Sequence, residues 1–116
     1  MPQKRRPPGP EDRIRADHII ALTREALAEF ATVSESDFLA RRLYQTSLAW
    51  YLQAIGEAAA RISDESRVLV PGVPWRQIVG TRNRLVHGYD AVDHDVLWEI
   101  VAADFPKLVL ALRALS

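Results

Sequence analysis

Apolar residues recur at spacings of three and four from Glu11 onward, and this repeat constrains the fold more than any other feature of the chain. The first segment shows the repeat most clearly, with one helical stripe formed by Ile14, His18, Ile19, Leu22, Ala26, Leu27 and Phe30. No segment alternates apolar and polar residues as a half-buried β-strand does. The chain has 116 residues, enough for one domain with a single core. These observations predict an all-α fold.

A second and longer helix is expected to begin near Ser34 or Ser36, because a serine side chain can accept hydrogen bonds from the first free backbone N–H groups. It continues to about Ser63 without a proline and with Gly56 as its only glycine. A glycine inside a helix costs about 1 kcal/mol relative to alanine. We therefore expect another helix to pack closely against Gly56.

The remainder of the chain predicts shorter elements separated by prolines and glycines. A linker is expected over 64–74, followed by a third helix over 75–87 that ends at Gly88. Asp93 is a candidate cap for a fourth helix. Pro106 is expected to break or restart that helix, because proline disfavours helical geometry in the residue before it. The predicted architecture is an antiparallel four-helix bundle with a short fifth C-terminal helix.

Residues 11–116 form the predicted helical domain, and residues 1–10 are expected to be a disordered leader rich in proline and basic side chains. The net charge is zero, but the leader holds three basic residues, which leaves 12 basic and 15 acidic ones in the domain. Strong non-specific nucleic-acid binders carry a basic excess on the folded domain. Any RNA contact of this domain is therefore expected to be local, and the leader could also contact phosphates.

Three absences narrow the function classes further. The chain has no cysteine, which excludes disulfides and zinc sites built on thiolates. It has no apolar stretch of the roughly 18 residues that a membrane helix needs. The basic N-terminus is not followed by the apolar segment of a signal peptide. The simplest expectation is a cytoplasmic protein that uses no metal or other cofactor.

The densest group of reactive side chains lies in 82–90, which reads Arg-Asn-Arg-Leu-Val-His-Gly-Tyr-Asp. Cleavage of RNA without a metal requires proton transfer at a ribose 2′-hydroxyl and at the leaving oxygen. Histidine suits both transfers because its pKa lies near neutrality. The planar fork of an arginine suits the phosphate, to which it can donate two hydrogen bonds. Arg82 and His87 are therefore the candidate catalytic pair.

Helix geometry decides which of these side chains can meet. Arg82 and His87 are five residues apart, about 140° around an ideal helix, so they meet only if the helix ends near His87 or a second subunit supplies one of them. Asn83 and Arg84 lie four and three residues before His87, and both are its surface neighbours and supporting candidates. In the alternative interpretation, both arginines form surface ion pairs with the aspartates that follow, and His87 only caps the helix.

The same residues carry a family resemblance. The segment 82–89 resembles the R-x4-H-x-Y motif of the HepT-like toxins, a branch of the HEPN ribonuclease superfamily, with Arg82, His87 and Tyr89 at the three motif positions. Three further blocks resemble that family in the same order: 55–59, 74–78, and 92–93 followed by 96–100. The resemblance as a whole covers roughly residues 12 to 115 and leaves only the leader outside.

The resemblance implies a dimeric endoribonuclease in which Arg82 and His87 of both subunits line one cleft. It also implies a toxin paired with an MntA-like nucleotidyltransferase antitoxin, which transfers AMP from ATP onto Tyr89. An AMP group there would add charge and bulk beside His87 and block the cleft, while Asn83 would orient the imidazole. The alternative is a catalytically inert helical module that binds such a nucleotidyltransferase.

The other noteworthy residues have ordinary structural interpretations. His18 is expected to pack within the first apolar stripe, and the tryptophans are expected to anchor the core or a dimer: Trp50, Trp75 and Trp98. His94 lies between two aspartates, but adjacent residues at a helix start point in different directions, so no metal site is expected there. Arg41 and Arg42 are expected on a solvated face, and the role of Glu57 is open.

Overall fold

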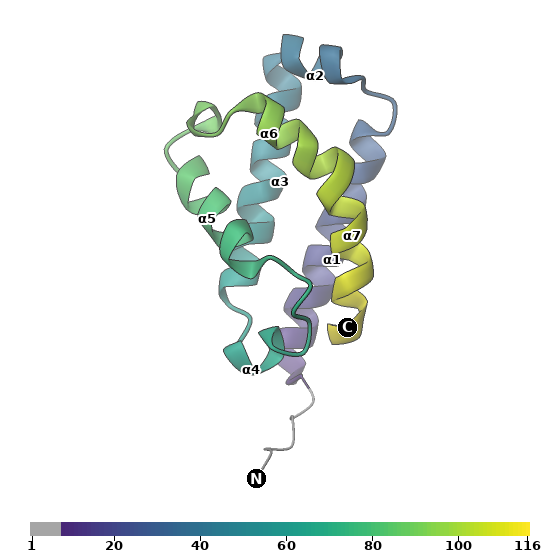
Figure 1. The fold of residues 1–116 in the computed structure, drawn as a ribbon, viewed down its shortest axis with the longest axis vertical. Coiled ribbons are helices and arrows are strands. Elements are labelled where there is room, and N and C mark those ends of the chain that lie inside the picture. Colours follow the sequence, from purple (N-terminus) through teal and green to yellow (C-terminus); the bar gives the residue numbers. More distant parts are fainter. Residues whose placement is uncertain (1–7) are drawn as a thin grey trace.

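The computed structural model describes residues 8–116, and every regular element in that range is helical (Figure 1). The predicted all-α class is therefore confirmed for this part of the chain. The first helix, α1 (Pro10–Phe30), begins one residue before the expected domain boundary. Residues 1–7 of the expected leader lie outside the described residues.

Two long helices, α1 and α3 (Arg42–Ala60), lie side by side through the length of the molecule (Figure 1). The helix α5 (Trp75–Leu85) packs mainly on α3, and the C-terminal helix α7 (Phe105–Leu112) packs mainly on α1. Fully buried aliphatic side chains close the core: Ile19, Leu48, Ile55, Leu97 and Leu112. Burial of each of these side chains stabilises the folded state by about 1.5–3 kcal/mol. This arrangement leaves one side of α5 outside the core.

The prediction of one long second helix is wrong, because this segment forms two helices. The helix α2 (Glu35–Ala40) ends at Arg41, whose extended backbone (φ −123°, ψ 118°) separates it from α3. The side-chain amide of Gln45 donates hydrogen bonds to the carbonyls of Phe38 and Leu39, both at 3.0 Å. These bonds satisfy the end of α2, and the break allows Phe38 to be fully buried.

Serine side chains begin two of the helices. The hydroxyl of Ser34 accepts a hydrogen bond from the backbone N–H of Asp37 at 3.1 Å, which confirms one of the two expected caps of the second segment. The hydroxyl of Ser63 accepts one from the N–H of Ser66 at 3.2 Å and begins α4 (Asp64–Arg67). The expected linker over 64–74 therefore contains a single helical turn.

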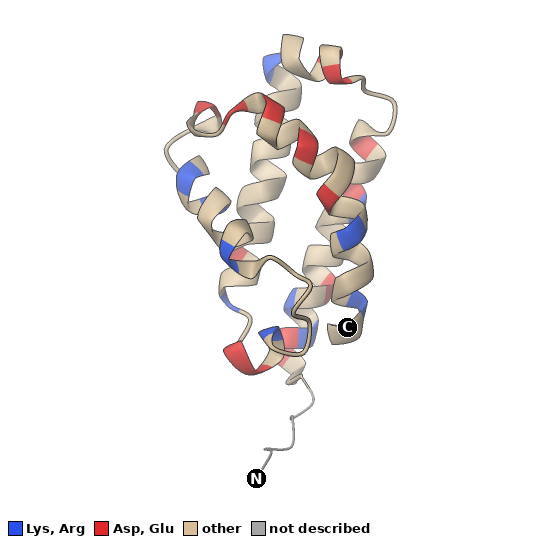
Figure 2. Ribbon diagram, in the orientation of Figure 1, with Lys and Arg blue, Asp and Glu red and all other residues tan. Residues whose placement is uncertain are grey.

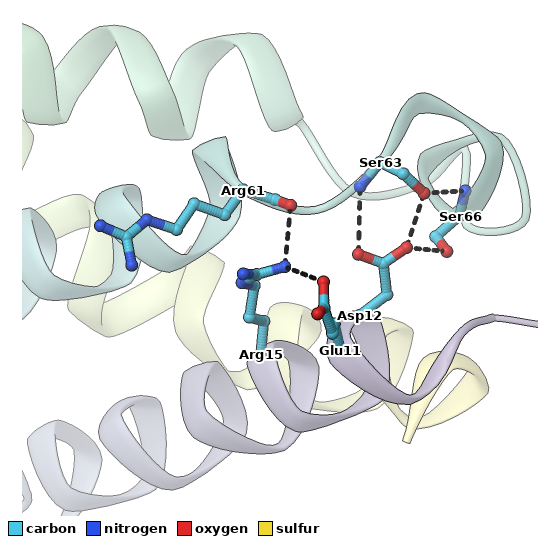
Figure 3. A network of polar contacts seen from close by, with 6 residues as sticks. All are labelled: Glu11, Asp12, Arg15, Arg61, Ser63 and Ser66. Atoms are coloured by element: carbon cyan, nitrogen blue, oxygen red, sulfur yellow. Dashed lines mark hydrogen bonds and ion pairs between the residues drawn. The ribbon is translucent and has the colours of Figure 1, made fainter.

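A buried carboxylate ties α1 to this turn (Figure 3). Asp12 accepts hydrogen bonds from the hydroxyls of Ser63 and Ser66, both at 2.6 Å, and from the backbone N–H of Ser63 at 3.2 Å. Burial by itself would raise the pKa of Asp12, but these three bonds and the nearby charge of Arg15 outweigh burial and hold the pKa below its ordinary value. The charged form of Asp12 therefore stabilises the contact between α1 and the start of α4.

The C-terminal segment stays helical through Pro106. The helix α6 (His94–Glu99) passes through a π-turn (Ile100–Asp104) into α7, in which Pro106 occupies the first turn. Phe105 keeps helical angles (φ −59°, ψ −43°), and its N–H bonds to the carbonyl of Ile100, five residues back. The break or restart expected at Pro106 therefore does not occur, because the wider π-turn accommodates the proline while Phe105 keeps helical angles.

The first apolar stripe is narrower than predicted. His18 is exposed, and Ile14 is 67% exposed, because the buried face of α1 runs through Ala16, Ile19 and neighbouring positions instead. The packed position expected for His18 is therefore wrong. The three tryptophans differ in burial: Trp75 is 9% exposed, Trp98 is half-buried with its ring centroid 5.3 Å from that of Phe38, and Trp50 is 60% exposed.

Candidate active site

The helix α5 holds most of the candidate residues and is fixed to the core at both ends. Trp75 and Leu85 are buried at its two ends, while much of the surface between them is open. The backbone N–H of Gly88 bonds to the carbonyl of Leu85 at 3.0 Å, and Gly88 has a φ of +126°. Only glycine adopts that angle readily. The helix α5 itself ends at Leu85, two residues before the expected end at His87, and the chain changes direction at Gly88 as expected.

Charge is distributed unevenly around this helix (Figure 2). All charged residues of α5 are basic, namely Arg76, Arg82 and Arg84, whereas α6 carries Asp95 and Glu99. A local excess of positive charge attracts phosphate even when the whole domain has none. That an RNA contact of this domain is local stays a prediction.

The side chain of Arg82 is held from two directions. Its Nη2 donates to Glu57 Oε1 on α3 and its Nη1 donates to Asn83 Oδ1, both at 3.0 Å. Beneath it, a Cβ added at Gly56 would overlap the Cβ of Arg82, which confirms the close helix packing expected at that glycine. Arg82 remains 30% exposed, so part of its guanidinium can still reach a ligand.

His87 lies exposed at the end of α5, where its backbone N–H bonds to the carbonyl of Arg84 at 3.1 Å. Within residues 8–116 no hydrogen bond joins His87 to Arg82 or to Asn83. One chain therefore presents the imidazole and the guanidinium at the same end of α5 without linking them. The orienting role expected of Asn83 toward His87 stays a prediction.

Within residues 8–116, neither Arg82 nor Arg84 forms an ion pair with the aspartates that follow the motif. Arg82 pairs with Glu57, and Arg84 donates from Nη2 to the hydroxyl of Thr81 at 3.4 Å. Asp90 instead has its Oδ1 3.1 Å from Nε2 of His94. The side chain of Arg84, which has no carboxylate partner within residues 8–116, lines a cavity beside α5.

Tyr89 belongs to a short 3₁₀ turn (Tyr89–Ala91) directly after Gly88. Its half-buried ring stacks on that of His94, with a centroid distance of 5.7 Å and an interplanar angle of 12°. The guanidinium of Arg42, at the start of α3, lies 5.9 Å from the centre of the Tyr89 ring. The Tyr89 hydroxyl makes no hydrogen bond to any residue in 8–116.

Sequence analysis left the role of Glu57 open and did not anticipate the position of Arg42. Glu57 follows the glycine at which α3 and α5 approach each other, and that glycine was a usable signal for a contact with α5. Arg42 is exposed as expected, but no local pattern could show that it reaches Tyr89, because only the break after α2 directs the start of α3 to that position.

No group of three metal-ligating side chains lies together in the described part of the chain. The absence of a metal cofactor stays a prediction. In the same part of the chain, no helix has the length and apolar character needed to cross a membrane.

Comparisons with known proteins agree with the motif. The model of a family described as "Ribonuclease HepT-like" matches residues 20–115. The chain is 37% identical over 90 residues to "Probable ribonuclease HepT" of Thermococcus cleftensis, covering 77% of this chain and 82% of that protein. It is 36% identical over 76 residues to a Methanocaldococcus jannaschii protein named as a "Putative RNase", covering 66% and 70%. No solved structure matches the chain.

Proposed function

Because this chain belongs to the ribonuclease HepT-like family and is a ribonuclease, we propose that Arg82 and His87 are the residues with which it cleaves RNA internally. The observation that carries this proposal is the placement of Arg82. Glu57 and Asn83 hold its fork at 3.0 Å each, at the end of α5 where the imidazole of His87 is exposed. An arginine held in this way is prepared to bind a phosphate.

The proposed reaction needs only these groups. The imidazole of His87 takes the proton of the 2′-hydroxyl, whose oxygen attacks the adjacent phosphorus. The bond from phosphorus to the 5′-oxygen breaks, and that oxygen receives a proton from an imidazolium. Arg82 stabilises the negative charge that develops on the phosphoryl oxygens. The products are a 2′,3′-cyclic phosphate, which can open to a 3′-phosphate, and a 5′-hydroxyl.

A second copy of the chain completes the proposed cleft. Arg82 and His87 are not bonded to each other within residues 8–116, and two histidines serve the two proton transfers better than one. The open face of α3 supplies an apolar surface for this contact, because Leu43 is 75% exposed and Trp50 is 60% exposed two helical turns further on. Val86, beside His87, is 53% exposed. A symmetric dimer would bury these side chains in both copies.

The proposed regulation acts at Tyr89. A toxin of this kind would be silenced in the cytoplasm by an MntA-like nucleotidyltransferase antitoxin that adds AMP from ATP to the tyrosine hydroxyl. That hydroxyl has no hydrogen-bond partner within residues 8–116, so it is available as an acceptor of the group. The added phosphodiester would bring a negative charge next to His87 and Arg42, where it would compete with the phosphate of RNA.

The test is cleavage of labelled RNA by the purified protein with and without EDTA. We expect cleavage that survives chelation, and a loss of about 10²–10⁴-fold in rate in His87→Ala and in Arg82→Ala. Light scattering on the same samples should give twice the chain mass of 13.1 kDa. Full activity in His87→Ala contradicts the mechanism, and an absence of cleavage by the parent protein favours an inert module that binds a nucleotidyltransferase.

A further inference from the structure

A cavity of about 490 Å³ opens beside α5, between that helix, the loop 72–74 and the C-terminal helical segment. Its walls are mainly aliphatic and aromatic: Leu52, Ile55, Ile78, Ile100, Phe105 and Leu108. Volumes of about 300–1,000 Å³ with apolar walls and a few polar groups are typical of sites for small ligands. This cavity can hold a flat group the size of a nucleobase together with its sugar.

The polar groups of the cavity are of mixed charge. Arg84 and Lys107 supply two cations, and Asp104 supplies one carboxylate. Thr81 accepts a hydrogen bond from Arg84 at 3.4 Å and so directs that guanidinium. Within residues 8–116, neither Lys107 nor Asp104 is engaged in an ion pair. The cavity thus offers cations for an anion and a free carboxylate for an N–H donor, around apolar walls.

A nucleotide carries these three features in one molecule. Its base is a flat, largely apolar surface whose edge bears N–H donors, and carboxylates accept hydrogen bonds from such edges. Its phosphate is the anion that arginine and lysine bind. Charge and shape therefore favour a nucleotide over a purely apolar ligand, which would leave Asp104 and Lys107 without partners.

The position of the cavity relates it to the proposed cleavage centre. Arg84 lines the cavity, and His87 follows it by three residues, just past the end of α5 at Leu85. The backbone N–H of His87 bonds to the carbonyl of Arg84 at 3.1 Å, so the two residues lie next to each other at this end of the helix. An RNA strand with one phosphate at His87 would bring an adjacent nucleotide within reach of Arg84.

We propose that this cavity binds the base and phosphate of one nucleotide next to the scissile bond, and so determines where the strand is cut. This inference rests on the proposed function, since it assigns a substrate subsite to the same helix. It gives Arg84 a specific role that differs from the support of His87 expected from sequence. It also gives a function to the π-turn, which contributes Ile100 and Asp104 to the cavity.

Gly72 provides a direct test, because it lines the cavity and a Cβ at this position would have no neighbour within 4 Å. Gly72 is exposed at the edge of the cavity and its φ lies outside the range that favours glycine, so Gly72→Phe should place a bulky ring at the cavity mouth without backbone strain. Gly9→Phe is the matched control, since Gly9 also faces open space but lies at the start of α1. Lys107→Ala is a second variant that removes one cation from an exposed position and leaves the walls intact.

Two measurements decide the proposal. Binding of 5′-AMP, 5′-GMP, 5′-CMP and 5′-UMP is followed by NMR titration, and the ends of the RNA fragments are sequenced to map the cut sites. We expect the parent protein and Gly9→Phe to bind at least one mononucleotide and to show the matching base preference beside the cut. In Gly72→Phe, the affinity for the mononucleotide and the base preference beside the cut should each fall about tenfold or more. Lys107→Ala should weaken mononucleotide binding.

The outcomes separate this inference from the proposed function. A parent protein that cleaves RNA but binds no mononucleotide, or a cut map that is unchanged in Gly72→Phe, overturns the subsite and leaves the ribonuclease mechanism standing. A parent protein that binds mononucleotides in the cavity but cleaves no RNA overturns the proposed function instead. Thermal melting of Gly72→Phe checks that it folds, and Lys107→Ala decides the matter if it does not.

Discussion

Gly56 and Arg82 meet at the crossing of α3 and α5, where a Cβ on the glycine would overlap the Cβ of the arginine and lie 2.7 Å from its Cγ. The carbonyl of Ile78 would lie 3.3 Å away, so backbone as well as side chain blocks the space. The absence of a side chain at Gly56 therefore sets both the distance between the helices and the base of the Arg82 side chain.

We expect Gly56→Ala to lower both stability and cleavage. The added methyl must push α5 away from α3, and overpacking of this kind costs about 1–3 kcal/mol. A displacement of Arg82 by about 1 Å can cost roughly 10²-fold in rate. Thermal melting and cleavage of labelled RNA measure the two effects.

Gly80→Ala is the matched control for that variant. Gly80 lies in α5, and a Cβ at this position would have no neighbour within 4 Å. The substitution should stabilise the helix by about 1 kcal/mol, because alanine is the better helix former. An active, stable Gly56→Ala protein would show that the close approach does not position Arg82.

Glu57 is expected to position Arg82 and not to take part in the reaction itself. Glu57→Ala removes one of the two bonds that hold the guanidinium, so we expect kcat to fall about tenfold through lost orientation. KM should change little or fall, because the loss of a carboxylate beside the cleft does not weaken the attraction of RNA. Glu57→Gln keeps an acceptor oxygen and should recover most of kcat. Equal activity in Glu57→Ala and the parent protein would refute the positioning role.

Acid stability should depend on Asp12. Because the pKa of Asp12 is lowered in the folded state, the unfolded chain takes up a proton first as the pH falls. The stabilisation is present above about pH 4 and is lost as the pH falls through the folded-state pKa. Asp12→Asn should cost about 1–3 kcal/mol at pH 7 and flatten the acid side of the stability curve.

Chemical unfolding from pH 3 to pH 7 measures this effect. Asp17→Asn is the control, since Asp17 is also on α1 but is exposed. It should leave the curve within about 0.5 kcal/mol of the parent protein. If the free energy of unfolding falls equally steeply with acid in Asp12→Asn and in the parent protein, the charge of Asp12 in its network with Ser63 and Ser66 does not contribute to stability.

The sequence predicted the parts of this structure that depend on local chemistry. The helical class, the serine cap at Ser34, the change of direction at Gly88 and the close packing at Gly56 each follow from one residue or from a short period. The break at Arg41 does not, because it depends on Gln45 reaching back to carbonyls of α2 and on the burial of Phe38. The exposed position of His18 likewise depends on which face of α1 the other helices cover.

The candidate site also has a part that the sequence predicts and a part that it does not. Its residue types and their spacing in 82–89 can be read from the chain, but the partners cannot. Glu57 and Arg42 reach the motif from α3 through the tertiary fold. Long-range contacts of this kind leave no periodic signal in one sequence.

The surroundings of Tyr89 lead to a prediction about control. Tyr44 offers a close comparison, because it is also half-buried and has a guanidinium near its ring, that of Arg41 at 5.8 Å. The two tyrosines differ in position: Tyr89 follows His87 by two residues, whereas Tyr44 packs on Phe30 with a centroid distance of 6.1 Å. A negative group on Tyr89 would therefore act next to the proposed cleavage centre, and one on Tyr44 would not.

We expect a nucleotidyltransferase partner, given ATP and magnesium, to add one or more AMP groups to Tyr89 and to silence cleavage. Tyr89→Phe keeps the ring on His94 but removes the acceptor oxygen, so it should still cleave RNA, gain no mass and resist the partner. Tyr44→Phe should be labelled and silenced like the parent protein. Intact-mass spectrometry and cleavage of labelled RNA, run on the same samples, give both readouts. If Tyr89→Phe gains the mass of AMP and loses activity as the parent does, the modified residue lies elsewhere and regulation at Tyr89 is wrong.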